Sequence, residues 1–106
     1  MGLKDMFSMM KDAAAMQKNM KRIQAALRQK TVEYKAGQVT VVARGDATIA
    51  SIKIDPSIID PAKPAVLEKA VQQAVEGALL AAQRASGEEV KKLAAEMGLP
   101  PGLAGG

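Results

Sequence analysis

Six basic side chains near the beginning of the chain are spaced to share one surface of a helix. They are Lys4, Lys11, Lys18, Lys21, Arg22 and Arg28. With Met6 taken as heptad position a, they occupy only positions f, b and c, which lie opposite the a and d positions. No acidic residue occupies these positions between Lys4 and Arg28. The chemistry that such a stripe offers is electrostatic binding of anions, above all of phosphate groups.

The ordinary explanation of a charged helix face is that it is simply solvated. Two observations favour binding instead. Solubility alone favours mixed charges, whereas this face carries only bases. The net charge of the chain is +4, and residues 1–30 hold seven bases against two acids, so the whole excess belongs to this segment. This asymmetry indicates nucleic acid, an anionic membrane surface or an acidic protein as the partner.

Lys91 and Lys92 are candidate additions to the same binding surface, because they lie near the end of a second expected helix. Bases near a helix C-terminus also complement the helix dipole whatever the function. The two explanations stay open for this pair.

The amino-acid composition excludes most catalytic and metal chemistry. Without His or Cys the chain has no zinc site of the usual ligand types, no Cys nucleophile and no His base. Asp46, Asp55 and Asp60 lie in turn sequences, where Asp commonly binds its own backbone. We therefore expect no catalytic site, metal, cofactor or small-molecule substrate.

The hydrophobic pattern predicts a protein that neither enters nor spans a membrane. No apolar run approaches the roughly 20 residues that cross a bilayer. Charged residues from Lys4 to Asp12 interrupt the segment in which a signal peptide would have its apolar run. We expect a cytoplasmic protein.

Residues 3–30 are predicted to form the helix that carries the basic stripe, because they lack Pro and are rich in strong helix formers. Apolar residues recur there at spacings of three and four, as in a heptad seam. This seam comprises Met6, Met9, Met16, Met20, Ile23 and Leu27, with Ala13 between them. Met-rich seams can bind varied partners, but core or dimer packing is the more common use.

After residue 30 the pattern predicts a sheet and a second helix. Period-two alternation indicates strands over residues 31–36, 38–44 and 48–54, with turns at Gly37 and Gly45. In the last strand, Ala50, Ile52 and Ile54 are expected to face inward. A helix over about 64–97 follows, with a weak point at Gly87, and then a flexible tail over 98–106. The prediction is one α+β domain over 1–106 with the order α-β-β-β-α and an antiparallel sheet.

The core of one protomer is expected to be thin. Only Phe7 and Tyr34 are aromatic, and much of the apolar content is Ala. Because small domains bury a low fraction of their surface, we expect a second subunit to complete the packing. A homodimer is therefore predicted.

Nucleic-acid binding can be narrowed to duplex DNA with low sequence specificity. Recognition of single strands commonly uses several aromatic stacking platforms, and this chain has two aromatic residues. Neutralising duplex phosphates needs only Lys and Arg. No helix-turn-helix is evident, and Asn19 is the only Asn for reading bases.

Several short segments, in their order along the chain, carry a resemblance to a known family. They are Met16-Gln17-Lys18-Asn19-Met20, Gly37-Gln38-Val39-Thr40-Val41, Ile52-Lys53-Ile54-Asp55-Pro56-Ser57, the Ala-rich helix from Leu67, and Leu99-Pro100-Pro101-Gly102. With them the chain resembles the YbaB/EbfC family of small bacterial nucleoid-associated proteins. The resemblance implies a tweezer-like homodimer that binds DNA in the nucleoid with relaxed sequence preference. The short Arg44–Thr48 loop and the Pro-rich connector 60–64 depart from the family pattern.

Two other functions remain as alternatives to DNA binding. In the first, the protein is a scaffold or adaptor whose helical seam docks on other proteins. In the second, the first helix lies on an anionic membrane, although the absence of Trp and the narrow seam disfavour it.

Overall fold

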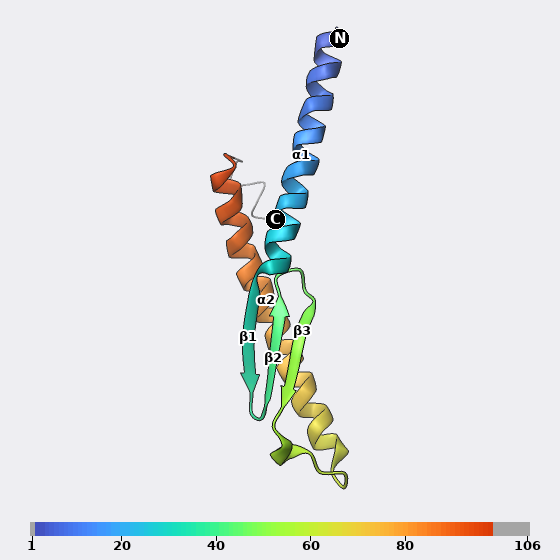
Figure 1. Cartoon of the computed structure of the whole chain (residues 1–106), viewed down its shortest axis with the longest axis vertical. Helices are drawn as coiled ribbons and strands as arrows, with labels where there is room; N and C mark the ends of the chain where they lie inside the picture. The colour runs from blue at the N-terminus through green and yellow to red at the C-terminus, as the bar shows by residue number, and fades with distance from the viewer. Residues whose placement is uncertain (1, 99–106) are drawn as a thin grey trace.

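The protomer is an α+β fold with the predicted order of elements, which confirms the fold class (Figure 1). In this computed structural model, residues 2–98 are described. The elements are α1 (Leu3–Gln29), β1 (Thr31–Ala36), β2 (Val39–Arg44), β3 (Ile49–Ile54), the short 3-10 helix η1 (Pro56–Ile58) and α2 (Pro64–Glu96). The two long helices and the three strands begin and end within one residue of their expected limits, whereas η1 lies in a segment that was not expected to be helical.

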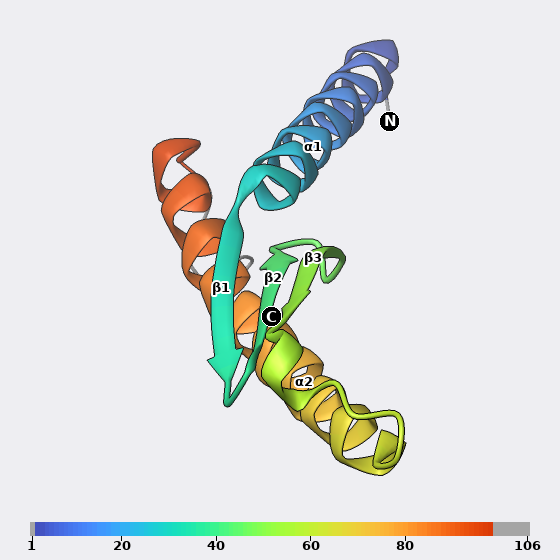
Figure 2. The same ribbon diagram turned by 60° about the horizontal axis from the view of Figure 1, so that its bottom comes forward.

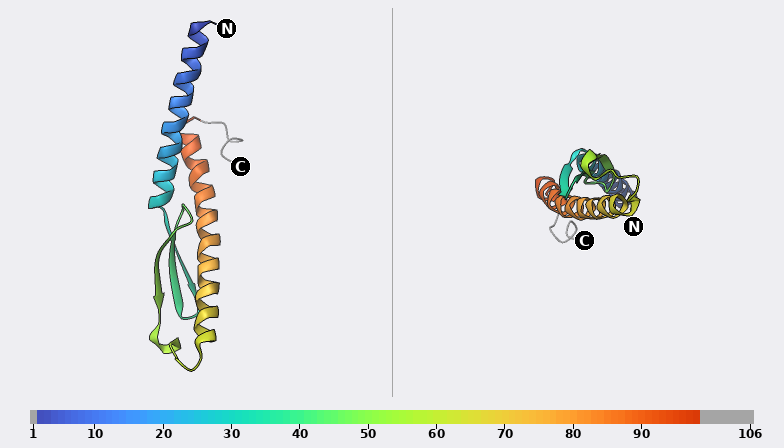
Figure 3. Two further views of the ribbon diagram at one scale, coloured as in Figure 1. Left: turned by 90° about the vertical axis from the view of Figure 1, so that its right-hand side faces the viewer. Right: turned by 90° about the horizontal axis from the view of Figure 1, so that it is seen from below.

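The three strands form an antiparallel sheet in the order β1-β2-β3, with one face covered by α2. β1 pairs with β2 so that Tyr34 lies opposite Val41, and β2 pairs with β3 so that Val41 lies opposite Ile52. Figure 3 shows α2 along one side of the sheet and no layer of described residues on the other side. The sheet therefore has one covered face and one open face, and the open face is turned to the viewer in Figure 1.

The prediction that Ala50 of β3 faces the core was wrong. The register shifts opposite Val42 and Ala43, so that Ala43 pairs with Ile49, and Ala50 is the extra residue of the bulge. As a result Ile49 packs against the core and Ala50 is exposed. A bulge inserts one residue into the alternation and thereby reverses the facing of the residues beyond it.

The core lies between the sheet and α2 and consists of small side chains. Val39, Val41 and Ala43 of β2 are buried against a stripe of α2 made by Ala74, Ala78 and Ala82. Alanine at successive turns lets the helix approach the sheet closely, because it adds little bulk between the two layers. Val39 and Val41 are the largest fully buried side chains among the described residues.

Gly77 of α2 allows the ring of Tyr34 in β1 to pack closely against the helix. A Cβ atom at Gly77 would lie 2.1 Å from Cε1 of Tyr34, so the ring fills the space that a side chain would need. Tyr34 therefore packs on α2 at the edge of the core, with 39% of its surface exposed.

α2 is continuous from Pro64 to Glu96 and passes through Gly87 without a break. It begins at Pro64, with its fixed φ suited to the first helical turn. Gly98 follows the helix with φ of +72°, a conformation that glycine adopts without strain. The rest of the predicted tail, residues 99–106, lies outside the described residues.

Within residues 2–98, α1 meets the other elements at its C-terminal part, where it contacts α2 and β2 (Figure 3). Gly45 lies against its last turns, and a Cβ there would be 2.7 Å from the carbonyl oxygen of Leu27. The backbone N–H of Gly45 also donates to the carbonyl of Lys30 at 2.8 Å. The N-terminal part of α1 extends beyond the end of α2 (Figures 1 and 2), in a protomer 73 Å long and 20 Å wide.

Candidate nucleic-acid interface

All six basic residues of the predicted stripe are exposed on α1. No residue of this helix is buried in the protomer. Figure 2 shows that α1 projects from the body, which is formed by the sheet and α2. Because no residue of α1 is buried, no other described element covers the stripe. The structure thus leaves the whole stripe, defined as Lys4, Lys11, Lys18, Lys21, Arg22 and Arg28, accessible to a partner.

Two shallow hollows lie along the stripe. One, of about 440 Å³, is lined by Ala14, Ala15, Gln17, Lys18 and Lys21. The other, of about 480 Å³, is lined by Lys21, Gln24, Ala25, Arg28 and Asp46. The small Ala side chains between the long basic ones make these hollows, so a ligand backbone can approach α1 closely there.

The apolar seam divides into two parts. Ile23 and Leu27 are half-buried, at the end of α1 that meets α2 and β2. The four methionines of the seam, Met6, Met9, Met16 and Met20, are 57%, 62%, 63% and 58% exposed. The seam is therefore used within the protomer at one end and open along most of its length.

Asp46 links the C-terminal end of the stripe to the sheet. Its carboxylate accepts hydrogen bonds from the hydroxyl and the backbone N–H of Thr48, which lower its pKa, and the charges of Arg28 and Arg44 lower it further. Arg44 is itself held in place by hydrogen bonds of 3.3 Å to Thr48 Oγ1 and to the carbonyl of Ile49. The Asp46 carboxylate thus lies near both Arg28 of α1 and Arg44 of β2.

The other loop carboxylates stabilise local backbone. Asp55 accepts from the backbone N–H of Ser57 at 2.9 Å, which lowers its pKa and caps η1. Asp60 accepts from the N–H of Ala62 at 2.9 Å. In residues 2–98, no group of three or more acidic side chains is placed to hold a metal ion.

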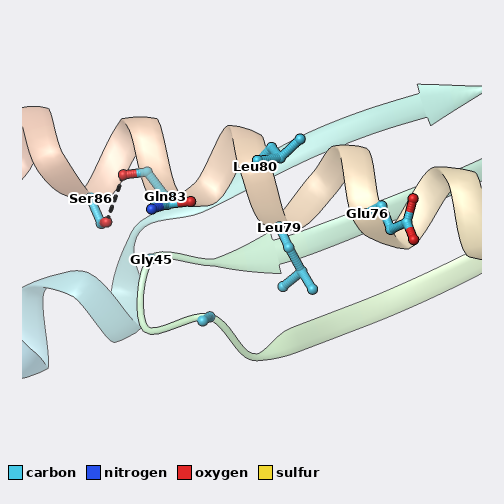
Figure 4. A pocket seen from close by; sticks show the side chains of 7 residues that line it. Gly45, Glu76, Leu79, Leu80, Gln83 and Ser86 are labelled. Atoms are coloured by element: carbon cyan, nitrogen blue, oxygen red, sulfur yellow. Dashed lines mark hydrogen bonds between the residues drawn. The ribbon is translucent and has the colours of Figure 1, made fainter.

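A hollow of about 670 Å³ lies between α2 and the turn after β2 (Figure 4). It is lined by Gly45, Ala47, Glu76, Leu79, Leu80, Gln83 and Ser86. The Ser86 hydroxyl donates to the carbonyl of Gln83 at 2.9 Å, so it is engaged by its own helix. Glu76 is the one carboxylate in this lining, with no basic residue beside it there, so the hollow lacks the paired groups of an active site.

Lys91 and Lys92 are exposed in the C-terminal part of α2. That part lies beside the C-terminal part of α1 (Figure 3), and the last turn of α2 contains no basic residue. Both lysines precede the last turn, which weakens the explanation by the helix dipole.

The model of the YbaB/EbfC DNA-binding family matches residues 1–97. The chain belongs to this family. The resemblance seen in the sequence is thereby confirmed, and the family is one of DNA-binding proteins, in agreement with the expectation of binding rather than catalysis.

Relatives in this family include proteins named nucleoid-associated. One from Acetivibrio thermocellus is 39% identical over 98 residues, covering 91% of this chain and 87% of the relative. One from Beijerinckia indica is 36% identical over 102 residues, covering 92% and 99%. A crystal structure of an uncharacterized protein from Helicobacter pylori shares the fold, with a TM-score of 0.57 at 21% identity over 92% of this chain and 97% of that one.

Membership of a YbaB/EbfC DNA-binding family supports DNA as the partner. None of the helices in residues 2–98 is long and apolar enough to cross a membrane.

Proposed function

We propose that this YbaB/EbfC protein binds duplex DNA in the nucleoid with low sequence specificity, as a homodimer, through the α1 stripe. The observation that carries the proposal is the exposed, acid-free stripe on a helix that projects from the body. Lys and Arg at this spacing neutralise phosphates without reading bases, so binding follows charge and shape rather than sequence. Lys91 and Lys92 extend this surface from α2. Effects on nucleoid organisation and gene expression would follow from such binding.

Duplex DNA fits the surface better than a single strand. Phe7 is the one aromatic residue on α1, and Tyr34 is engaged with Gly77. Single-strand binding without sequence preference usually stacks successive bases on several aromatic rings. Because α1 has one aromatic side chain, it cannot stack several successive bases.

The open part of the Met seam supports the homodimer. Met6, Met9, Met16 and Met20 form an exposed apolar line along α1, and a second α1 can cover such a line by knobs-into-holes packing. The seam and the stripe lie on opposite faces of α1, so dimerisation and DNA binding do not compete. Sedimentation velocity of a Met16→Gln/Met20→Gln variant tests this packing, with the variant expected to dissociate at concentrations where the wild type stays dimeric.

A salt titration on two duplexes of unrelated sequence tests the function. With five or six bases per protomer on phosphates, log affinity should fall against log salt with a slope of about −5 per bound protomer. The two duplexes should give the same slope and similar affinities. A large preference for one duplex contradicts low specificity. No binding at physiological salt, together with stoichiometric recovery of one protein from nuclease-treated lysate, favours the adaptor instead.

A further inference from the structure

The open face of the sheet carries basic and hydroxyl side chains that the stripe does not include. Because Val39, Val41 and Ala43 face α2, the alternate residues of β2 and their cross-strand partners face away from it. These outward residues are Thr31, Glu33, Lys35, Thr40, Val42, Arg44, Ser51 and Lys53. Three are bases and one is an acid, so this face is positively charged.

Three of these residues form one row across all three strands. Lys35 lies opposite Thr40, and Thr40 lies opposite Lys53. Both lysines are exposed, with the half-buried Thr40 between them. Two antiparallel steps of about 5 Å separate the lysine backbones by about 10 Å. Each strand of a duplex carries one phosphate about every 3.4 Å of helix axis, so two lysines about 10 Å apart can contact different phosphates of the same duplex.

The row lies at the end of the sheet away from α1, and the Glu33–Val42–Ser51 row separates it from Arg44. Arg28 ends the stripe and lines a hollow with Asp46 of the turn that joins β2 to β3. Arg44, on the open face of β2, lies close enough to act on the same carboxylate. Bases are therefore present on α1, beside this turn and at the far end of the sheet, with Glu33 as the one acid of the open face.

The composition of the open face decides what can cover it. Its apolar outward residues are Val42 and the bulge residue Ala50, whereas the cores of protein interfaces are depleted of charged residues. Exposed lysines beside a hydroxyl suit a phosphate backbone, since both donate to phosphate oxygens. An anionic polymer fits this face better than a second copy of the chain.

We propose that the open sheet face is a second phosphate-binding surface, in which Lys35 and Lys53 contact the same duplex that the α1 stripe binds. The inference rests on the proposed DNA binding and extends it from one helix to two elements. The duplex then runs along α1 and across the sheet, and the protomer's footprint is longer than α1 alone.

The test is a salt titration of duplex binding with a Lys35→Gln/Lys53→Gln variant of the full chain. Loss of two phosphate contacts should make the slope of log affinity against log salt shallower by about 1.8 per bound protomer. The matched control is Lys69→Gln/Arg84→Gln, which removes the same charge from exposed positions of α2 outside its buried Ala stripe. The control should keep the wild-type slope.

An unchanged slope in the Lys35→Gln/Lys53→Gln variant, with the wild type binding normally, overturns the second surface alone. A wild type that shows no salt-dependent duplex binding overturns the proposed function as well. Lysine acylation of the wild type provides a measurement that does not depend on variant folding. Lys35 and Lys53 should be protected when duplex is bound and Lys69 should not, and equal acylation of Lys35 and Lys53 with and without duplex overturns the proposal.

Discussion

The two long helices of this protein use the same amphipathic pattern for opposite purposes. α2 turns Ala74, Ala78 and Ala82 onto the sheet and buries them, whereas α1 has no buried residue. The residues that α2 buries are all Ala, so the sheet can approach closely. The apolar residues of α1 larger than Ala are mostly Met, whose flexible side chains adapt to another surface. α2 and the sheet therefore stabilise the fold, whereas the side chains of α1 remain exposed for binding.

The same difference appears in how each helix is stabilised. α2 is packed along the sheet over much of its length, so tertiary contacts support it. The N-terminal part of α1 depends on the helix propensity of its Met, Ala, Lys and Gln residues, because it projects beyond the end of α2.

The largest difference in the free energy of unfolding is expected when Ala is replaced by Leu once in each helix. Ala78→Leu inserts three carbons into the closest part of the body and should lower the free energy of unfolding by about 1–3 kcal/mol. Ala13→Leu, on the exposed seam, should change it by less than about 0.5 kcal/mol. Urea denaturation at matched concentration measures both. Equal destabilisation by the two changes would contradict the division between body and free helix.

A second pair of substitutions tests the joint between α1 and the body. Gly45→Ala places a Cβ 2.7 Å from the Leu27 carbonyl oxygen, so the backbone must shift, and we expect a loss of about 1 kcal/mol or more. Gly87→Ala meets nothing within 4 Å and should gain up to about 1 kcal/mol, because Ala is the better helix former. Thermal unfolding compares them. A Gly45→Ala protein as stable as the wild type would show that α1 is not seated against this turn.

The smallest effect concerns the two turn carboxylates of the body at low pH. Hydrogen bonds lower the pKa values of Asp46 and Asp55 below their ordinary value of 3.8, so each stabilises the fold above that pH. This contribution is lost as the pH falls through the folded-state pKa values. Asp46→Asn/Asp55→Asn keeps an oxygen acceptor without the titration, so its Tm should fall less steeply than that of the wild type from about pH 4 to pH 2. Circular dichroism measures the two profiles, and parallel profiles would contradict this role.

The sequence allowed prediction of the features that depend on local pattern. The heptad spacing of Met6 to Leu27 predicts α1, and period-two alternation predicts the strands, because each pattern is set by the periodicity of one element. The basic stripe was predictable for the same reason. The pairing of residues that are distant along the chain was not. The bulge at Ala50, the contact of Gly45 with Leu27, and the ring of Tyr34 on Gly77 each depend on tertiary packing.

The basic row of the sheet shows where prediction from the sequence stopped. Lys35 and Lys53 were visible as polar positions of two strands, but their alignment across Thr40 depends on the register of both strand pairs. A register change of one residue would reverse the face on which each strand presents its side chains.

On the proposed function, α1 binds DNA while the body maintains the fold. Charge reversal of Lys11, Lys18 and Lys21 to Glu separates these two roles when duplex binding and thermal unfolding are measured on the same samples. The control reverses Lys63, Lys69 and Arg84, which are exposed and outside the stripe, and so gives the same net charge. We expect the α1 variant to lose duplex binding at an unchanged Tm while the control still binds. Intact duplex binding by the α1 variant would show that the stripe is not the DNA-binding surface.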